Sequence, residues 1–343
     1  MGVHPDRRKQ LRVLRLQGQR EMKTKTWIVT VVIAAIAFAG LNVMAYNHAR
    51  AMMHFTASGD RTRKPETLTL WQKAGVLLFG VNVPRPAGQQ PPADLATDCR
   101  VLKISAPKGI TLEAWYCDLG PSTPLVILFH GYAAQKTALL QEARMFLDLG
   151  TSVLLVDFRG SGGSSESYTT VGIHESDDVA TLVQFSQRNL SHSRVILFGQ
   201  SMGAVAILGA IRNHGIQPDA VILEAVFDTL LNTVRNRFHA MRVPSFSSAE
   251  LLVFWGGQQQ GFNGFSHNPV DYAMSVECPA LFMHGRDDPR ATLDEGRRVF
   301  NAVPGPKQFT TFDRTGHESY VSTHASEWRT TVEAFIKETG QSE

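Results

Sequence analysis

The chain has 343 residues, of which 43% are hydrophobic and 19% are charged, and its formal net charge is +3. These values are typical of a globular protein and exclude a disordered or coiled-coil chain. The charge is unevenly distributed, because residues 1–25 carry a net charge of +6 and the rest of the chain carries −3. A slightly acidic body with a basic tail argues against nucleic acid as the main partner.

A charge-free, mostly apolar segment follows the basic tail. No residue from Thr26 to Tyr46 is charged, and the segment has the roughly 20 residues that a helix needs to cross a bilayer. Trp27 and Tyr46 stand at its ends, where aromatic rings favour the membrane interface. Because the basic residues lie only on the N-terminal side, the positive-inside rule predicts a cytoplasmic tail at 1–25, a transmembrane signal-anchor at 26–46, and export of the remainder to the periplasmic or extracellular side.

A cleaved signal peptide is the alternative interpretation of this segment. Ala37–Ala39 and Val43–Ala45 each offer the small residues of a cleavage site. The basic region and the apolar run are both longer than in a typical signal peptide, which favours an uncleaved anchor over a cleaved signal or a buried core helix. The anchor and the signal peptide both predict that the catalytic domain is exported.

Residues 47–97 are predicted to form a juxtamembrane connector. Within it, Leu68–Phe79 is expected to be a helix that lies either on the folded domain or on the membrane surface. Prolines at 84, 86, 91 and 92 interrupt regular structure after this helix.

Two of the three cysteines flank a predicted hairpin. If Ser105 pairs with Thr111, Cys99 falls opposite Cys117, so that a cross-strand disulfide would form in an oxidising compartment. The register is not determined by the sequence alone, so two free thiols are favoured and the disulfide is the alternative.

Short apolar runs alternate with helical patterns after residue 98, which predicts βαβ units and a parallel sheet. Most of the runs are rich in Val, Ile and Leu without strict alternation, as expected of strands buried on both faces. The predicted strands are Val101–Ser105, Ile110–Tyr116, Leu125–Phe129, Val153–Asp157, Val195–Phe198, Val221–Glu224 and Ala280–His284. The predicted helices are Lys136–Leu149, Glu175–Arg188 and Met202–His214.

An insertion interrupts this alternation at about 227–277, inside a catalytic domain predicted to span 98–340. Its length and its own aromatic residues favour a cap over a simple loop. A cap of this kind covers a site and shapes an acyl or peptidyl pocket.

The sharpest motif is the G-x-S-x-G sequence at 199–203. It follows the predicted strand Val195–Phe198 and precedes the helix from Met202, which is the strand–turn–helix context that a nucleophile elbow requires. The motif therefore predicts Ser201 as a nucleophile and the backbone N–H of Met202 as one donor to an oxyanion.

A serine hydroxyl is a weak nucleophile until a base takes its proton. In folds with this elbow the acid and then the histidine follow the serine along the chain. His317 lies late in the sequence, before the final helix, and is the predicted base. Asp287 and Asp288 both follow the strand Ala280–His284, and either could hold the imidazole in the correct tautomer.

Five motifs occur in a fixed order between residues 98 and 340. They are His130-Gly131-Tyr132, the D-x-R-G-x-G-x-S turn from Asp157 to Ser164, G-x-S-M-G at 199–203, His284-Gly285-Arg286-Asp287-Asp288, and Gly316-His317. This series resembles the serine aminopeptidase and monoglyceride-lipase-like branch of the α/β-hydrolase superfamily. One departure is Arg290-Ala291, where a valine is common after the acid turn.

The resemblance implies an α/β-hydrolase fold, in which a mostly parallel sheet is flanked by helices and carries a small helical cap. It favours Asp288 as the acid, with Asp287 as the alternative. It also assigns the second oxyanion N–H to Tyr132, whose ring is expected to line the acyl pocket. Asp157 and Arg159 are expected to tie a strand end to neighbouring loops.

The predicted function is hydrolysis of a carboxylic ester, thioester or amide through an acyl-enzyme on Ser201. An acyltransferase with the same triad and a non-catalytic binding protein on the same scaffold are the alternatives. No metal or organic cofactor is implied. The expected partners are a small acyl or peptidyl substrate and the membrane that the N-terminal helix enters. An aminopeptidase would also need an acidic site for a free amine, and the sequence indicates none.

Overall fold

The central sheet has eight strands in the order β1-β2-β4-β3-β5-β6-β7-β8 in the computed structural model, which describes residues 5–64, 67–95 and 99–341. β2 is antiparallel to β1 and β4, whereas the strands from β4 across to β8 are all parallel. The strands are β1 (Cys99–Ser105), β2 (Thr111–Cys117), β3 (Leu125–Phe129), β4 (Ser152–Asp157), β5 (Val195–Gln200), β6 (Ala220–Glu224), β7 (Ala280–Gly285) and β8 (Lys307–Phe312). The predicted mostly parallel sheet is confirmed.

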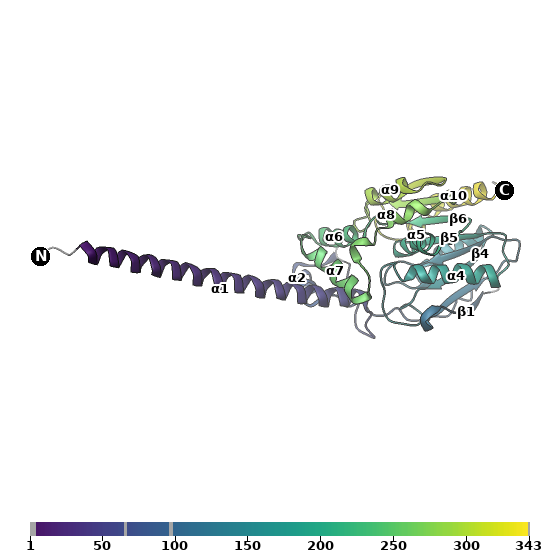
Figure 1. The fold of residues 1–343 in the computed structure, drawn as a ribbon. Helices are drawn as coiled ribbons and strands as arrows, with labels where there is room; N and C mark the ends of the chain where they lie inside the picture. Colours follow the sequence, from purple (N-terminus) through teal and green to yellow (C-terminus); the bar gives the residue numbers. More distant parts are fainter. Residues whose placement is uncertain (1–4, 65–66, 96–98, 342–343) are drawn as a thin grey trace.

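Helices cover both faces of the sheet (Figure 1). The helices are α1 (Pro5–Met53), α2 (Leu70–Phe79), α3 (Leu140–Asp148), α4 (Glu175–Asn189), α5 (Met202–His214), α6 (Leu230–Met241), α7 (Ser248–Gln260), α8 (Pro269–Tyr272), α9 (Leu293–Ala302) and α10 (Tyr320–Gly340). Short 3-10 helices occupy Pro107–Gly109, Lys136–Leu139, Gly264–Ser266 and Ala273–Ser275. α4, α5, α8 and α9 pack on one face, and α3 and α10 pack on the other.

The alternation of side chains along β4 explains why there are two cores. Leu154 and Val156 point into the core with α4 and α5, while Val153 and Leu155 point into the core with α3 and α10. All four side chains are fully buried, as expected of an inner strand of a parallel sheet.

α1 runs without a break from the basic tail into the folded domain. Its 49 residues make it about 74 Å long, and most of that length projects away from the domain (Figure 1). Among the described residues it is the one helix with the length and apolar composition to cross a membrane. Its last turns pack on the domain, where Ala45 and Ala49 share a small apolar core with α6 and α7.

The insertion after β6 contains α6, α7 and α8. α7 packs on α1 and α6 packs on α7, so that the three helices share one apolar core, whereas α8 joins the helices that cover the sheet beside α5. α6 and α7 therefore form the part of 227–277 that stands over the end of the sheet.

The connector is held against the domain by its backbone. Phe55 N–H donates to the Ser167 carbonyl at 2.7 Å, and Gly162 N–H donates to the Pro86 carbonyl at 3.0 Å. α2 begins at a complete capping box of Thr69 and Gln72. The expected boundary between connector and catalytic domain at 97–98 lies outside the described residues.

The first hairpin carries a disulfide. Ser105 pairs with Thr111 and Cys99 with Cys117, which is the register that the disulfide alternative required. Cys99 and Cys117 are bonded, and Cys278 is a free thiol.

Candidate active site

Ser201 stands on a sharp turn between β5 and α5. Its backbone has φ 53° and ψ −111°, a strained conformation for a residue other than glycine. The turn is possible because glycine lies on both sides of it. A Cβ on Gly203 would overlap the carbonyl oxygen of Phe129, and a Cβ on Gly199 would lie 2.5 Å from the Ala204 nitrogen. The G-x-S-x-G sequence thus follows from the close approach of three chain segments.

His317 and Asp288 approach Ser201 from two other loops. His317 follows β8, and its Nε2 lies 3.0 Å from Ser201 Oγ. Asp288 follows β7, and its Oδ2 lies 2.6 Å from His317 Nδ1. All three residues therefore meet at the carboxyl ends of parallel strands, where α/β folds place their ligand sites.

Asp288 is fixed by its second oxygen. Oδ1 accepts the backbone N–H groups of Arg290 at 2.8 Å and Ala291 at 3.0 Å. Burial alone would raise the pKa of this carboxyl, but His317 and the two N–H donors lower the pKa below its usual value. Asp288 is thus held as a carboxylate facing the imidazole.

Asp287, the alternative acid, lies differently. Its side chain is exposed, and its backbone N–H donates to the Thr315 carbonyl at 3.0 Å. The structure therefore brings Asp288, and not Asp287, into hydrogen-bonding distance of His317.

The two expected oxyanion donors flank the nucleophile. Met202 is the first residue of α5, so its N–H is one that no carbonyl of its own helix accepts. Tyr132 follows Gly131, where an added Cβ would lie 3.6 Å from the Cβ of Ser201. Both residues thus lie next to Ser201, and their role as donors stays a prediction.

His130 supports the loop that contains Tyr132. Its Nε2 accepts the Phe158 N–H at 3.2 Å, and its Nδ1 is 2.8 Å from the Gly131 carbonyl oxygen. Complete burial lowers the pKa of this imidazole, so the neutral form with Nδ1 protonated satisfies both contacts.

Asp157 and Arg159 anchor the loop after β4, as expected. Arg159 Nη2 donates to Asp178 Oδ1 at 2.6 Å. Asp157 accepts the Gly163 N–H at 2.9 Å and pairs with the fully buried Lys136, which also donates to Glu113 at 2.9 Å. The buried Lys136 was not anticipated from the sequence.

Two buried carboxyl groups lie behind the nucleophile, and sequence reasoning missed both. The backbone carbonyl of Glu224 accepts the Ser201 N–H at 2.8 Å, and its side chain accepts Trp328 Nε1–H at 2.6 Å. Burial, reinforced by the nearby Glu142, raises the pKa of Glu224 to about 8. Burial also raises the pKa of Glu142, whose Oε1 accepts the Ser319 hydroxyl at 2.5 Å. Burial and the neighbouring carboxyl thus both favour the protonated form of Glu224.

A cavity of about 740 Å³ opens above Ser201 and His317. Val234, Phe238 and Leu252 of the cap form one wall, and the last turns of α1 form another. The α1 residues that line it are Leu41, Met44, Ala45, His48 and Met52. No sequence signal indicated that the N-terminal helix would border the site.

Tyr132 links α1 to the nucleophile. Its hydroxyl donates to the Met52 carbonyl at 2.5 Å, and the Arg237 guanidinium lies 5.7 Å from the centre of its ring. The ring lines the cavity, as expected.

The charged side chains around the cavity are basic. Arg61, Arg63, Lys64, Arg237 and Arg290 contribute to its lining, and no Asp or Glu of the described residues does so. The described part of the chain also contains no cluster of three or more His, Cys, Asp or Glu side chains arranged to hold a metal ion.

Comparisons with known proteins agree with this fold. Residues 120–247 match the family model described as serine aminopeptidase, S33, a stretch that includes Ser201 but ends before Asp288 and His317. The chain is 27% identical over 236 residues to the uncharacterized protein YqkD of Bacillus subtilis. The aligned region covers 68% of this chain and 77% of YqkD.

Solved structures with similar folds include an esterase and a phospholipase. The Pyrococcus furiosus esterase Pf2001 superposes with a TM-score of 0.61 and 22% identity, over 75% of this chain and 99% of that one. A membrane phospholipase A superposes with a TM-score of 0.52 and 15% identity, over 71% of this chain and 87% of that one. The α/β-hydrolase fold expected from the sequence is confirmed.

Proposed function

We propose that this chain, which belongs to the α/β-hydrolase superfamily, is a membrane-anchored serine hydrolase that cleaves carboxylic esters of apolar acyl groups. The observation that carries the proposal is the hydrogen-bonded series Ser201–His317–Asp288 at the floor of an apolar cavity. A nucleophile, a base and an orienting acid at these distances have the geometry that acyl transfer needs.

The reaction follows from these positions. His317 Nε2 takes the proton of Ser201 Oγ as the oxygen attacks the ester carbonyl, and Asp288 stabilises the imidazolium that forms. The N–H groups of Tyr132 and Met202 stabilise the oxyanion. His317 then returns the proton to the leaving alcohol, and water activated by the same imidazole hydrolyses the acyl-enzyme.

The lining of the cavity supports an ester with an apolar acyl group over an aminoacyl amide. A substrate with a free amine would need an acidic partner, whereas the described lining residues supply only cationic charge. Apolar side chains from α1 and the cap favour a hydrocarbon chain. Two proteins of similar structure, an esterase and a membrane phospholipase A, are in line with this choice.

The membrane anchor rests on α1. The basic tail before the apolar segment supports a cytoplasmic N-terminus and a domain exported to the periplasmic or extracellular side. The Cys99–Cys117 disulfide supports an oxidising compartment for the domain.

The assignment of Ser201 is tested with a fluorophosphonate probe on the full-length protein in detergent. Wild-type protein should become labelled and should hydrolyse p-nitrophenyl esters, and Ser201→Ala should lose both properties because Ser201 Oγ is the hydroxyl within hydrogen-bonding distance of His317 Nε2. The exposed Ser191 offers a matched control, and Ser191→Ala should behave as wild type. Equal labelling of wild type and Ser201→Ala would refute the assignment. A panel of aminoacyl amides beside the esters tests the substrate class.

A further inference from the structure

The freely exposed apolar part of α1 is too short to cross a bilayer by itself. Trp27–Gly40 is exposed throughout, and at 1.5 Å per residue it is about 21 Å long. The hydrocarbon core of a bilayer is about 30 Å thick. The missing length must come from residues 41–46, which complete the charge-free segment.

Those same residues contact the cap. Trp255 Nε1–H donates to Asn42 Oδ1 at 3.1 Å, and the Gln259 side chain donates to the Tyr46 carbonyl at 2.9 Å. Ala45 is buried in the core that α1 shares with α6 and α7. The edge of the hydrocarbon core therefore lies at the level of α7, so the cap itself meets the membrane.

Aromatic side chains gather at this level. The rings of Tyr46 and Trp255 pack edge to face, with their centroids 5.5 Å apart. The rings of Phe254 and Trp255 also pack edge to face, with their centroids 5.0 Å apart. Tyr46 and Phe254 remain exposed on the surface. Aromatic rings favour the boundary between hydrocarbon and headgroups, which agrees with the level deduced from the length of α1.

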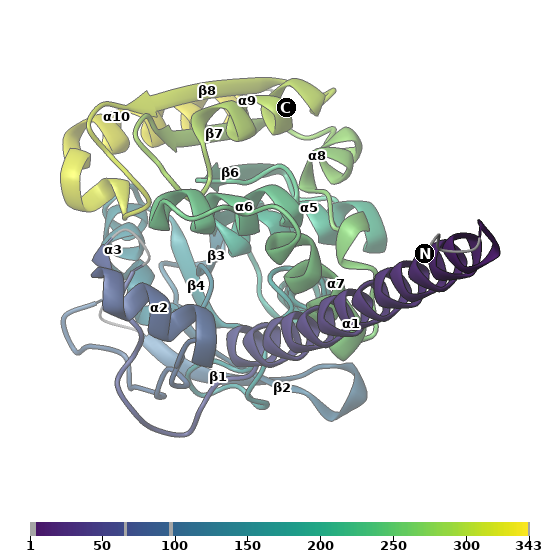
Figure 2. The same ribbon diagram turned by 90° about the vertical axis from the view of Figure 1, so that its left-hand side faces the viewer.

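Four large apolar side chains at this end of the domain are almost entirely exposed. Leu70 is 82% exposed, Trp71 88%, Phe79 87% and Phe246, between α6 and α7, 84%. α2 buries none of its ten residues, although it is a well-capped helix. Figure 2, seen from the side from which α1 projects, shows α2, α6 and α7 facing the viewer around α1. We call Leu70, Trp71, Phe79 and Phe246 the apolar face.

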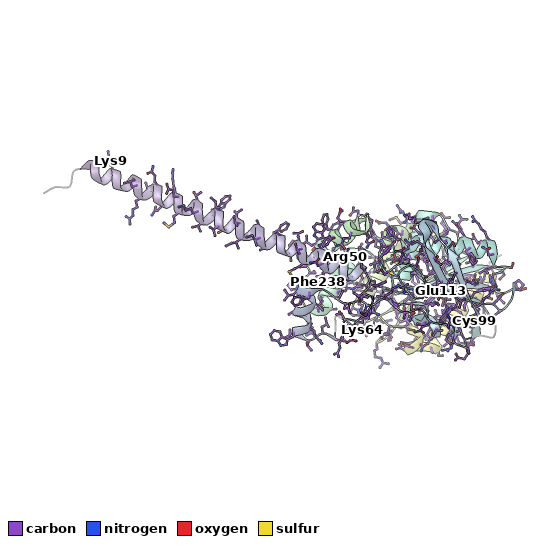
Figure 3. All side chains as sticks on the ribbon, turned by 90° about the horizontal axis from the view of Figure 1, so that it is seen from below. Lys9, Arg50, Lys64, Cys99, Glu113 and Phe238 are labelled. Carbon is purple, nitrogen blue, oxygen red and sulfur yellow. A yellow bond between two sulfur atoms is a disulfide. The ribbon has the colours of Figure 1, made fainter. Side chains whose placement is uncertain are left out.

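Basic side chains lie beside the apolar face. Arg61, Arg63 and Lys64 are exposed and lie on the segment between α1 and α2. Figure 3 shows Lys64 and Phe238 at the same end of the domain as Arg50, where α1 enters it. Cations next to an exposed apolar face suit the anionic headgroups of a bilayer.

The cavity over Ser201 reaches the same level. Its lining extends from Ser201 and His317 to Leu41 and Met44, which lie on the charge-free segment of α1. Leu77 of α2 lines the cavity as well. The space between α1, α2 and the cap thus connects the nucleophile with the depth at which acyl chains of a bilayer begin.

We propose that the apolar face inserts into the bilayer interface and that the cavity takes the acyl chain of its ester substrate directly from the bilayer, with α1 as one wall. The inference that the domain contacts the bilayer is supported by the length of α1 and by the exposure of the apolar face. The delivery of an acyl ester rests on the proposed function.

The first test measures where the apolar face lies. Full-length Cys278→Ser protein carrying Phe79→Cys or Phe246→Cys is nitroxide-labelled and reconstituted in vesicles of phosphatidylcholine and phosphatidylglycerol. Oxygen, which concentrates in hydrocarbon, should relax these labels more than a water-soluble nickel chelate. Leu119→Cys is the matched control, because Leu119 is also an exposed apolar side chain, with 46% of its surface accessible. It lies just after β2, whose last residue, Cys117, pairs with the start of β4, so it is at the end of the sheet away from the active site. Its label should respond mainly to nickel.

The second test measures delivery. Trp71→Ser/Phe79→Ser/Phe246→Ser should hydrolyse soluble p-nitrophenyl acetate like wild type, because none of the three residues lines the cavity. Its rate on 4-methylumbelliferyl oleate embedded in the vesicles should fall about tenfold, which corresponds to about 1.4 kcal/mol. Leu119→Ser should leave both rates unchanged.

Each outcome separates the two proposals. Labels at 79 and 246 that respond mainly to nickel, or that are shielded from both reagents as in contact with a second copy of the chain, would overturn the bilayer contact. Equal oleate rates for the triple variant and wild type would overturn delivery from the bilayer. Absence of activity on both esters in wild type would instead refute the proposed function and leave the labelling result interpretable.

Discussion

Asp288 and Asp287 are neighbours in sequence, yet their carboxyl groups have different surroundings. One carboxyl oxygen of Asp288 accepts hydrogen bonds from two backbone N–H groups, and the other is hydrogen-bonded to His317. The side chain of Asp287 is exposed. In an Asp288→Asn protein the amide oxygen would keep the two N–H bonds, so the amide nitrogen would face His317 Nδ1. A donor would then stand where the imidazole needs an acceptor, and the wrong tautomer would be favoured.

We therefore expect Asp288→Asn to lower kcat by up to about 10⁴-fold, the loss known for the equivalent change in a serine protease. Asp287→Asn should cost less than about tenfold, because an exposed charge is screened by solvent and salt. The measurement is kcat of both variants on one soluble ester at one pH, with thermal melts to show that both are folded. A large loss in Asp287→Asn together with a near-normal Asp288→Asn would show that the acid is misassigned.

Single residues were predictable from sequence where a local motif constrains them. The glycines around Ser201 are required by close backbone contacts, so the nucleophile elbow can be recognised from a motif of five consecutive residues. Lys136 and Glu224 could not be found in this way. A charged residue is normally exposed, and burial of these two depends on partners 21 to 104 positions away in the chain.

At the scale of elements, the inner strands were predicted well because burial on both faces leaves uninterrupted apolar runs. β8 was missed for the converse reason. Four of its six residues, Lys307–Phe312, are polar, and most of its side chains are only partly buried at the edge of the sheet. The cap was recognised as an insertion, but its division into α6 and α7 over the site and α8 beside α5 depends on tertiary packing.

The first hairpin carries a prediction about stability. β1 is an edge strand that pairs only with β2 in the sheet, and the disulfide closes a loop with a sequence separation of 18. Cys99→Ser/Cys117→Ser should lower the free energy of unfolding by about 3 kcal/mol, chiefly because the unfolded chain gains freedom. The measurement is denaturant unfolding of the detergent-solubilised protein, with Cys278→Ser as the control for loss of a thiol that forms no bond.

Two further outcomes define the hairpin prediction. Thiol alkylation of unfolded, unreduced wild-type protein should modify Cys278 but neither Cys99 nor Cys117. An unchanged midpoint in the double variant, or alkylation at all three cysteines, would show that the two strands are held by backbone pairing and side-chain packing alone.

At the scale of the whole molecule, α1 is both the proposed membrane anchor and part of the folded domain, so the domain is not simply joined to an anchor by a flexible linker. Its C-terminal turns share a core with α6 and α7, and Met52 accepts the hydroxyl of Tyr132 next to the nucleophile. The sequence could not predict this, since hydropathy marks a span without indicating what its last turn contacts. The parallel sheet, by contrast, could be predicted, because the alternation of strands and helices is visible in local sequence patterns.

The integration of α1 also bears on whether the N-terminal segment is cleaved. α1 is helical through both candidate cleavage sites, Ala37–Ala39 and Val43–Ala45, and Ala45 is buried against the cap. Cleavage after Ala45 would remove Leu41 and Met44 from the cavity wall. We infer that the segment is retained as an anchor.

The last prediction is therefore that the chain stays in the membrane, with its domain exported. An N-terminal epitope tag and the domain should remain on one polypeptide that resists a carbonate wash, since about 20 apolar residues hold it in the bilayer. Alkaline phosphatase fused after residue 343 should be active, because this reporter folds only outside the cytoplasm. Replacing Arg20, Lys23 and Lys25 by glutamine should reduce the exported fraction, since orientation follows the basic residues that flank the span. Loss of the tag and release by the wash would indicate a cleaved signal, and an inactive reporter on an intact membrane protein would reverse the orientation.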